Sequence, residues 1–196
     1  MGAVMLSTHE FLSSISTHIQ RIGAVGLLPL VIIQPGGKVL TQKFRTDDWK
    51  AMADEALARS QHANVYAPLH LVRNGLASYE RGKLPDISAV FGVVIDDDSD
   101  KRAVEPPFAP SFELVTSRVP HRNRQLGFLF NRVLSGSEAL PIAAMLHAKC
   151  GGDHGTKDVV HVWRIPGTLN HPTANKIARG RPQTPQLVEG VWHAGA

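Results

Sequence analysis

The stretch ISAVFGVVIDDDSD, residues 87–100, joins an almost continuously apolar run to four aspartates within five positions. A β-branched, apolar run of this kind is typical of a strand that is buried on both faces at the centre of a sheet. The carboxylates follow at the carboxyl end of that strand, where ligands of open α/β sheets bind. Because like charges repel and a desolvated carboxylate needs compensation, the stretch predicts a cation nearby.

The alternation of side chains along a strand places Asp96 and Asp98 on one face and turns Asp97 to the other. A same-face pair of carboxylates can hold one or two hard divalent cations such as Mg²⁺, and two such ions support phosphoryl transfer. An EF-hand is excluded, because Lys101 stands where that loop needs Gly and Pro107 where it needs Glu. A solvated acidic turn is the alternative interpretation.

Periodicity and turn chemistry predict the remaining elements. The first helix is expected to begin at Ser7 or Thr8 as its cap, and the second at Thr46 or Asp47. We expect helices over 7–23, 46–61 and 137–152, a hairpin over 27–44, and strands over 64–72, 111–117 and 159–165. Residues 125–134 fit a strand or a strand-to-helix run, and residues 166–185 are interpreted as a surface loop.

Composition indicates one globular domain, because 196 residues with 43% hydrophobic and 19% charged side chains can bury a core. No apolar run reaches the length of a membrane span, so we expect no membrane partner and a cytoplasmic location. Cys150 is the single cysteine, which excludes an internal disulfide framework and a Cys-rich zinc cluster.

Positive charge is unevenly distributed along the chain, whose net charge is +4. Lys and Arg bunch at 81–83, 121–124 and 176–181. Basic groups of this kind beside an acidic cluster suit a polyanion held next to a metal ion. Solvated basic loops are the alternative interpretation.

Three segments together resemble the archaeo-eukaryotic primase superfamily, the primase-polymerases. VFGVVIDDDSD is similar to the family's first motif, an apolar strand that ends in Asp, any residue, Asp. TSRVPHRNRQLGFLF occupies the place of the second motif, and DVVHVWRIPGTLNHP followed by NKIARGR is similar to the third motif of plasmid and phage primases. The three matches fall in the family's order and cover about residues 60–182.

The resemblance implies an α+β fold with a central, mostly antiparallel sheet of the RRM-like primase core, flanked by helices, after an N-terminal helix, hairpin, helix and strand. We expect a single primase-polymerase-like domain over residues 1–196. It would comprise an N-terminal module of about 1–70, a metal-bearing core of about 71–182 and a short C-terminal tail.

The resemblance also implies site residues. Asp96, Asp98 and Asp158 match the catalytic, metal-binding acids, and the family's cofactor is Mg²⁺ or Mn²⁺. The expected nucleotide-binding residues are Ser117, His121, Gln125, Arg164 and Lys176, with Asn170 as a weaker candidate. Phosphates of nucleic acid are expected on Arg122, Arg124, Arg179 and Arg181.

The chain departs from the family pattern at three points. Asp97 stands between the two motif acids in place of an apolar residue, and His161 stands where an Arg is usual. The spacer of the second motif is longer and more basic than usual, so His121 competes with Gln125 for the phosphate role.

Two functions therefore remain. One is a nucleotidyltransferase of a plasmid, phage or other mobile element, which joins nucleoside triphosphates on a single-stranded DNA template, with a helicase domain or protein as a further partner. The other is a catalytically weak or inactive replication-initiation module on the same fold, which binds nucleic acid without turnover. The two functions make different predictions for Asp96 and Asp98. Loss of either acid should abolish nucleotide incorporation by an enzyme but leave nucleic-acid binding by a binding module nearly unchanged.

Overall fold

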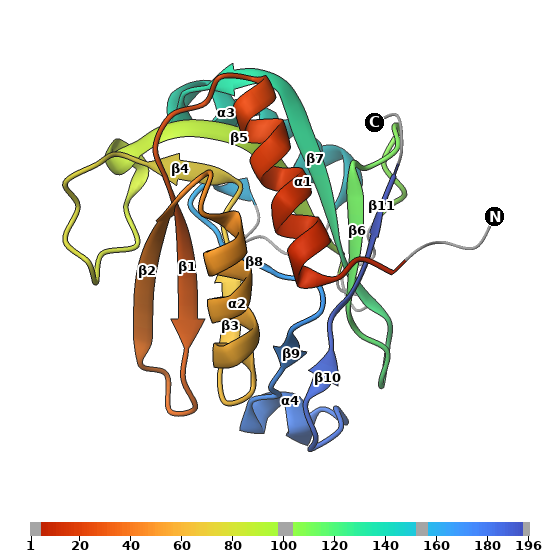
Figure 1. The fold of residues 1–196 in the computed structure, drawn as a ribbon. Coiled ribbons are helices and arrows are strands. Elements are labelled where there is room, and N and C mark those ends of the chain that lie inside the picture. Colours follow the sequence, from red (N-terminus) through yellow and green to blue (C-terminus); the bar gives the residue numbers. More distant parts are fainter. Residues whose placement is uncertain (1–4, 98–103, 152–156, 194–196) are drawn as a thin grey trace.

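The computed structural model describes residues 5–97, 104–151 and 157–193. Within these ranges, nine strands form one antiparallel sheet in the order β11-β6-β7-β5-β4-β1-β3-β8, with β2 paired to β1 (Figure 1). The strands of this sheet are β1 (Leu27–Ile33), β2 (Val39–Arg45), β3 (Asn64–Ala67), β4 (His70–Val72), β5 (Ile87–Asp97), β6 (Phe112–Ser117), β7 (Asn123–Leu134), β8 (Trp163–Arg164) and β11 (Glu189–Trp192).

Helices cover both faces of this sheet. The helices α1 (Thr8–Arg21) and α2 (Trp49–Ser60) lie side by side on one face, and α3 (Gly136–Cys150) lies on the other (Figure 1). The smaller elements are a 3₁₀ turn (Leu84–Asp86), α4 (Ala174–Ala178) and a ribbon of β9 (Leu169–Asn170) with β10 (Gln186–Leu187). No helix in the described ranges is both long enough and apolar enough to cross a membrane.

The strand β5 sits between the two cores. Its residues Phe91 and Val94 pack into the core under α1 and α2, whereas Val93 and Ile95 pack into the core under α3. This arrangement confirms the strand buried on both faces that its apolar sequence predicts. The α+β class with an antiparallel sheet and flanking helices is also confirmed.

The prediction for the start of the second helix was wrong by one to two residues. Asp48 is the N-cap of α2 and makes no hydrogen bond with its side chain. Asp47 does not cap the helix, because both of its carboxylate oxygens accept hydrogen bonds at 3.0 Å from the guanidinium of Arg45. For α1 the prediction is confirmed, with Ser7 as the cap of a capping box.

Two predicted strands are shorter than their sequences suggested. Residues 64–72 form two strands, β3 and β4, which are separated at Pro68 and both pair with β1. Residues 159–165 give only the two-residue strand β8. The side chain of Asp158 accepts a hydrogen bond from the backbone N–H of Val160, and such local bonds favour a turn over an extended strand.

The surface-loop prediction for residues 166–185 needs correction as well. This segment contains α4 and the strand β9, which pairs with β10, and Thr168 and Asn170 are buried within it. Asn170 donates through Nδ2 to the carbonyl of Thr116 at 2.6 Å. The segment is therefore bonded to the end of β6, and beyond it β11 forms the edge of the main sheet.

A glycine on β7 makes room for the largest ring cluster of the core. A Cβ at Gly127 would lie 2.0 Å from Cζ of Phe112. Phe112 cannot yield easily, because its ring is buried against Phe11, at 5.1 Å between centroids, and Trp192, at 5.9 Å. We expect Gly127→Ala to lower the free energy of unfolding by about 2 kcal/mol and Tm by roughly 4–8 °C, measured by thermal unfolding.

The double variant Gly127→Ala with Phe112→Leu is the control for this prediction. Removing the ring edge relieves the clash, so the double variant should be more stable than the sum of the two single effects predicts. Strictly additive losses would show that the Cβ does not meet the ring.

Candidate active site

The acidic end of β5 has the facing that strand geometry predicts. Asp96 follows Ile95 and lies opposite Gln125 of β7 in the sheet register. Asp97 turns to the other face, where its carboxylate accepts from Arg124 at 2.6 Å. Asp98 lies outside the described residues, so its predicted place beside Asp96 stays a prediction.

One side chain connects all three motif segments. Gln125 is buried, and its Nε2 donates to Oδ1 of Asp96 at 3.4 Å, a long hydrogen bond. Its Oε1 accepts from the backbone N–H of Arg164 at 3.0 Å. The amide thereby links the end of β5, the start of β7 and β8, which are far apart in the chain.

Arg164 is a buried cation without a carboxylate partner among the described residues. Its side chain is 5% exposed, and Nη1 donates to Oδ1 of Asn64 at 2.6 Å. The guanidinium carbon lies 4.4 Å from the ring centroid of Tyr66, within cation–π range. Asn64 also accepts from the N–H of His171 at 2.7 Å, so β3 and the segment after β9 hold the Arg164 site together.

The charges around Arg164 are predominantly positive. Burial lowers the pKa of Arg164, Arg181 nearby lowers it further, and Tyr66 and Asp96 act in the opposite direction. Burial likewise raises the pKa of the Tyr66 phenol. Two guanidinium groups that repel each other beside a single carboxylate form a favourable place for a phosphate group.

Sequence reasoning missed Asn64, Tyr66 and His171. Asn64 and Tyr66 carry no motif, and their only signal is the polar alternation of the third predicted strand, which usually marks a solvated face. Arg164, the partner that makes them part of the site, lies about one hundred positions downstream. His171 lies within the third-motif segment, but the motif assigns it no role.

The other residues of the second motif lie at the end of β6 and in the turn that leads to β7. Ser117 is buried at the end of β6, and its Oγ donates to the carbonyl of His121 at 3.4 Å. His121 itself is exposed in the turn between β6 and β7. Asn170 is buried and bonded to the carbonyl of Thr116, which precedes Ser117, and its Oδ1 has no hydrogen-bond partner in the described chain. Lys176 is half-buried on α4.

The four arginines predicted to contact nucleic acid fall into two groups. Arg122 pairs with Glu113 at 2.5 Å, and Arg124 pairs with Asp97 and with Glu105. Arg179 and Arg181 make no ion pair with a carboxylate in the described ranges. Arg179 and Arg181 can therefore bind an external phosphate directly. Arg122 and Arg124 would first have to break their ion pairs with carboxylates.

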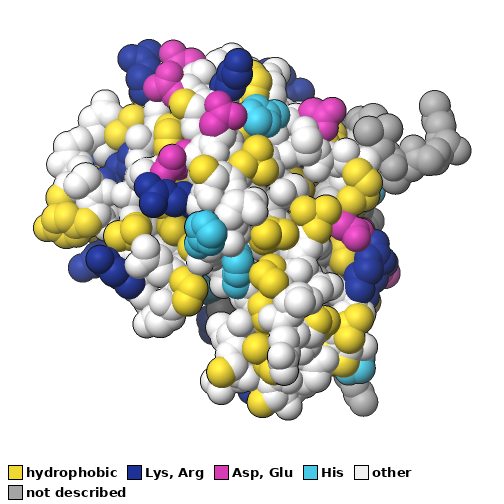
Figure 2. Space-filling model, turned by 60° about the horizontal axis from the view of Figure 1, so that its bottom comes forward, with side chains coloured by type: hydrophobic (Ala, Val, Ile, Leu, Met, Phe, Trp, Pro, Cys, Tyr) yellow, Lys and Arg dark blue, Asp and Glu magenta, His cyan; other side chains and the backbone are white. Residues whose placement is uncertain are grey.

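The face in Figure 2 shows the same mixture of charges. Its Lys and Arg side chains lie in separate groups, several of them next to Asp or Glu side chains. On the described part of this face, no single basic field extends across the surface. On this face, positive charge is therefore interspersed with acidic side chains.

Asp158 lies in the bend before β8. Its Oδ1 accepts from the N–H of Val160 at 2.9 Å, and its Oδ2 lies 3.3 Å from Nδ1 of His161. The neighbouring carbonyl, of Val159, accepts from Nδ1 of the fully buried His70 on β4 at 2.8 Å. The bend is thus anchored to the centre of the sheet.

The metal prediction can be examined only in part. Within residues 5–97, 104–151 and 157–193, no group of three His, Cys, Asp or Glu side chains is placed to hold a metal ion. Of the three predicted ligands, Asp98 lies outside these ranges. The carboxylate chemistry of Asp96 and Asp158 fits Mg²⁺ or Mn²⁺, both of which prefer oxygen ligands.

No protein-family model and no curated protein matches the chain. Solved structures do match its fold. The AEP domain of the cyanophage S-2L primase-polymerase is similar with a TM-score of 0.60 and 15% identity, over 94% of this chain and 91% of that one.

Two structures of the primase RepB' are also similar to this chain. One has a TM-score of 0.58 and 15% identity over 90% of this chain and 54% of that one. The other is its catalytic domain in complex with initiator DNA, with a TM-score of 0.54 and 16% identity over 90% and 81%. The resemblance stated from the three motifs is thereby confirmed at the level of the fold: this chain has the fold of the archaeo-eukaryotic primase (AEP) domains.

Proposed function

We propose that this chain is a nucleotidyltransferase of the primase-polymerase type, which joins nucleoside triphosphates on a single-stranded DNA template. The observation that carries the proposal is the contact of Gln125 with both Asp96 and the backbone of Arg164. It brings the acidic strand end, the second motif and the arginine of the third motif into one site. The similarity to primase domains supports the same reading.

Each side chain has a task in this proposal. Asp96, with Asp98 and Asp158, would hold Mg²⁺ or Mn²⁺, which when bound lowers the pKa of a 3'-hydroxyl and stabilises the leaving phosphate oxygens. Arg164 would bind the triphosphate, because no carboxylate pairs with its guanidinium among the described residues. Gln125 positions the Asp96 carboxylate relative to Arg164.

The template is proposed to lie near α4. Arg179 and Arg181 lie at the end of this helix without carboxylate partners among the described residues, so they can neutralise DNA phosphates. Ser117 at the end of β6 and Asn170 of β9, which is bonded to the carbonyl of the neighbouring Thr116, would contact the nucleotide. A source in a plasmid, phage or other mobile element is part of the proposal, because the similar proteins include a phage enzyme.

A binding module without turnover is the second candidate. It is favoured by His161, which replaces a motif arginine and lies 3.3 Å from Asp158, a predicted metal ligand. In that case Arg179 and Arg181 would still bind nucleic acid, but the acids would have no catalytic task.

Removal of divalent metal gives the direct test of the enzyme proposal. We expect the chain to incorporate nucleotides on single-stranded DNA in Mn²⁺ or Mg²⁺, and excess EDTA to lower this rate by at least about 100-fold, because the phosphoryl-transfer charge is then uncompensated. Gel analysis of labelled products measures the rate. No product with either metal, under conditions in which the nucleotide binds, would contradict the proposal.

A further inference from the structure

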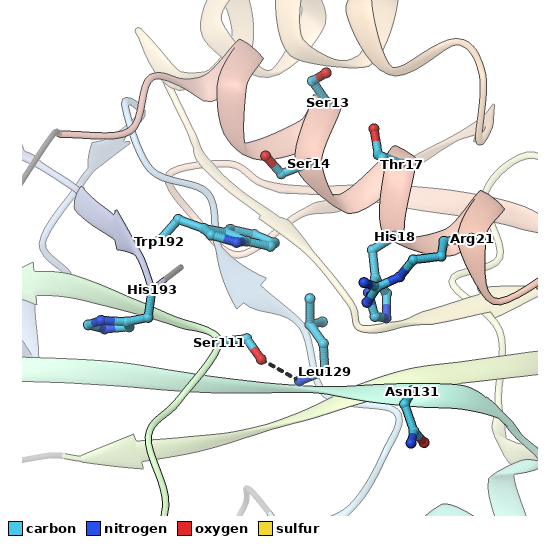
Figure 3. Close-up of a pocket in the computed structure, with 10 residues that line it drawn as sticks. All are labelled: Ser13, Ser14, Thr17, His18, Arg21, Ser111, Leu129, Asn131, Trp192 and His193. Carbon is cyan, nitrogen blue, oxygen red and sulfur yellow. Dashed lines mark hydrogen bonds between the residues drawn. The ribbon is translucent and has the colours of Figure 1, made fainter. Parts of the chain in front are cut away.

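A second concave site lies away from Asp96, between α1 and the sheet. It is a cavity of about 490 Å³, which is within the size range of small-molecule sites. Figure 3 shows its walls. The helix α1, with His18 and Arg21, forms one wall. The other wall consists of Leu129 of β7, Trp192 of β11 and Ser111, which precedes β6. Leu129 lies four residues beyond Gln125 on β7, roughly 13 Å away at the usual rise of a strand.

His18 positions Arg21 at the edge of this cavity. The Arg21 guanidinium can only donate, so the 3.0 Å contact makes Nδ1 of His18 the acceptor. Burial and Arg21 lower the pKa of His18, and the Phe130 backbone acts in the opposite direction. His18 is 6% exposed and its Nε2 is fully buried, so the ring supports Arg21 and does not itself reach a ligand.

Arg21 and Ser111 can donate to a ligand in the cavity. Arg21 is exposed and makes no ion pair in the described ranges, unlike most of the arginines there. Ser111 accepts from the N–H of Leu129 at 3.1 Å, which leaves its own hydroxyl proton to donate (Figure 3). The described residues that line the cavity include no Asp or Glu. A guanidinium without an ion pair, a donating hydroxyl and no carboxylate among the described lining residues favour an anion in this cavity.

The size of the cavity and its aromatic wall indicate more than an inorganic ion. The Trp192 ring projects into the space between α1 and the sheet (Figure 3), and Ser14 of α1 adds a hydroxyl on the opposite side. A ring or sugar can lie against this indole while a phosphate group reaches Arg21. We propose that the cavity binds a small phosphate monoester, with its phosphate on Arg21, which His18 positions, and its organic part against Trp192.

The test does not depend on the proposed function. Calorimetric titration of the full chain, with EDTA present to remove divalent ions, compares adenosine 5'-monophosphate, ribose 5-phosphate, inorganic phosphate and adenosine. We expect the monoesters to bind most tightly. Arg21→Gln should weaken their binding by at least about 10-fold, because a charge-assisted contact to phosphate is lost.

Two variants serve as controls. Arg59→Gln removes an arginine that is paired with Glu55 on α2, at 2.7 Å, and should leave the affinity unchanged. Asp96→Asn should also leave it unchanged, which separates this cavity from the candidate active site. The ¹H–¹³C signal of His18 should shift on binding in the wild type.

Four results would overturn the proposal: no saturable binding, equal weakening by Arg59→Gln, inorganic phosphate or adenosine binding as tightly as the monoesters, or loss of binding in Asp96→Asn. The last of these would assign the ligand to the active site instead.

Discussion

Asp96→Asn is expected to lower nucleotide incorporation by about 1,000-fold or more, because the neutral amide can no longer hold a divalent cation against the transferring phosphate. The amide has the shape of the carboxylate and can still accept from Gln125, so β5 and its register with β7 should be retained. Single-turnover incorporation on a primed template measures the loss, and circular dichroism checks the fold.

DNA binding separates the two candidate functions. Asp96→Asn should bind single-stranded DNA about as well as the wild type in fluorescence anisotropy, since the predicted DNA contacts are Arg179 and Arg181. Asp47→Asn, an exposed acid that is paired with Arg45, is the matched control and should keep full incorporation. If Asp96→Asn incorporated nucleotides at the wild-type rate, the site proposed here would be wrong. A wild type that binds DNA without incorporation would support the binding module.

Acid is expected to destabilise the protein through His70. Burial lowers the pKa of His70 from 6.5 to about 4, and Arg81 contributes in the same direction, while Asp158 and the Val159 carbonyl oppose it. Below pH 6.5 the unfolded chain takes up a proton that the folded chain refuses until about pH 4. The free energy of unfolding should therefore fall as the pH is lowered through this window, by about 3 kcal/mol in total from this group.

Urea unfolding at a series of pH values measures this slope. His70→Gln removes the titrating group, so its stability should depend less on pH between 6.5 and 4, whatever its absolute stability. His62→Gln, which replaces an exposed histidine, should keep the wild-type slope. An unchanged slope in His70→Gln would mean that His70 does not carry the effect.

Local sequence signals predicted most of the elements because their causes are local. The capping box at Ser7, the hairpin over 27–44 and the apolar run at 87–95 each depend on residues that are neighbours in the chain. The predictions failed where a distant or competing contact determined the backbone. Asp47 binds Arg45 instead of capping α2, and Asn170 binds the carbonyl of Thr116 instead of lying in a loop.

The candidate site divides in the same way. Asp96, Gln125 and Arg164 could be named from motifs, and the structure brings them into contact. The environment of Arg164 could not be predicted, because Asn64 and Tyr66 belong to another strand and carry no motif. The ion pairs of Arg122 and Arg124 were equally hidden, since a basic run does not reveal which acids will face it.

The sequence by itself determined most of the strands and helices, and which face of β5 carries Asp96, because side-chain periodicity follows from backbone geometry. Only the tertiary structure decided which of the basic side chains keep an unsatisfied charge. That outcome depends on pairing across strands and on burial, as the buried Arg164 and the exposed Arg21 show. Whether a charged side chain stays unpaired therefore depends on the residues around it in space, and the sequence alone does not show which residues those are.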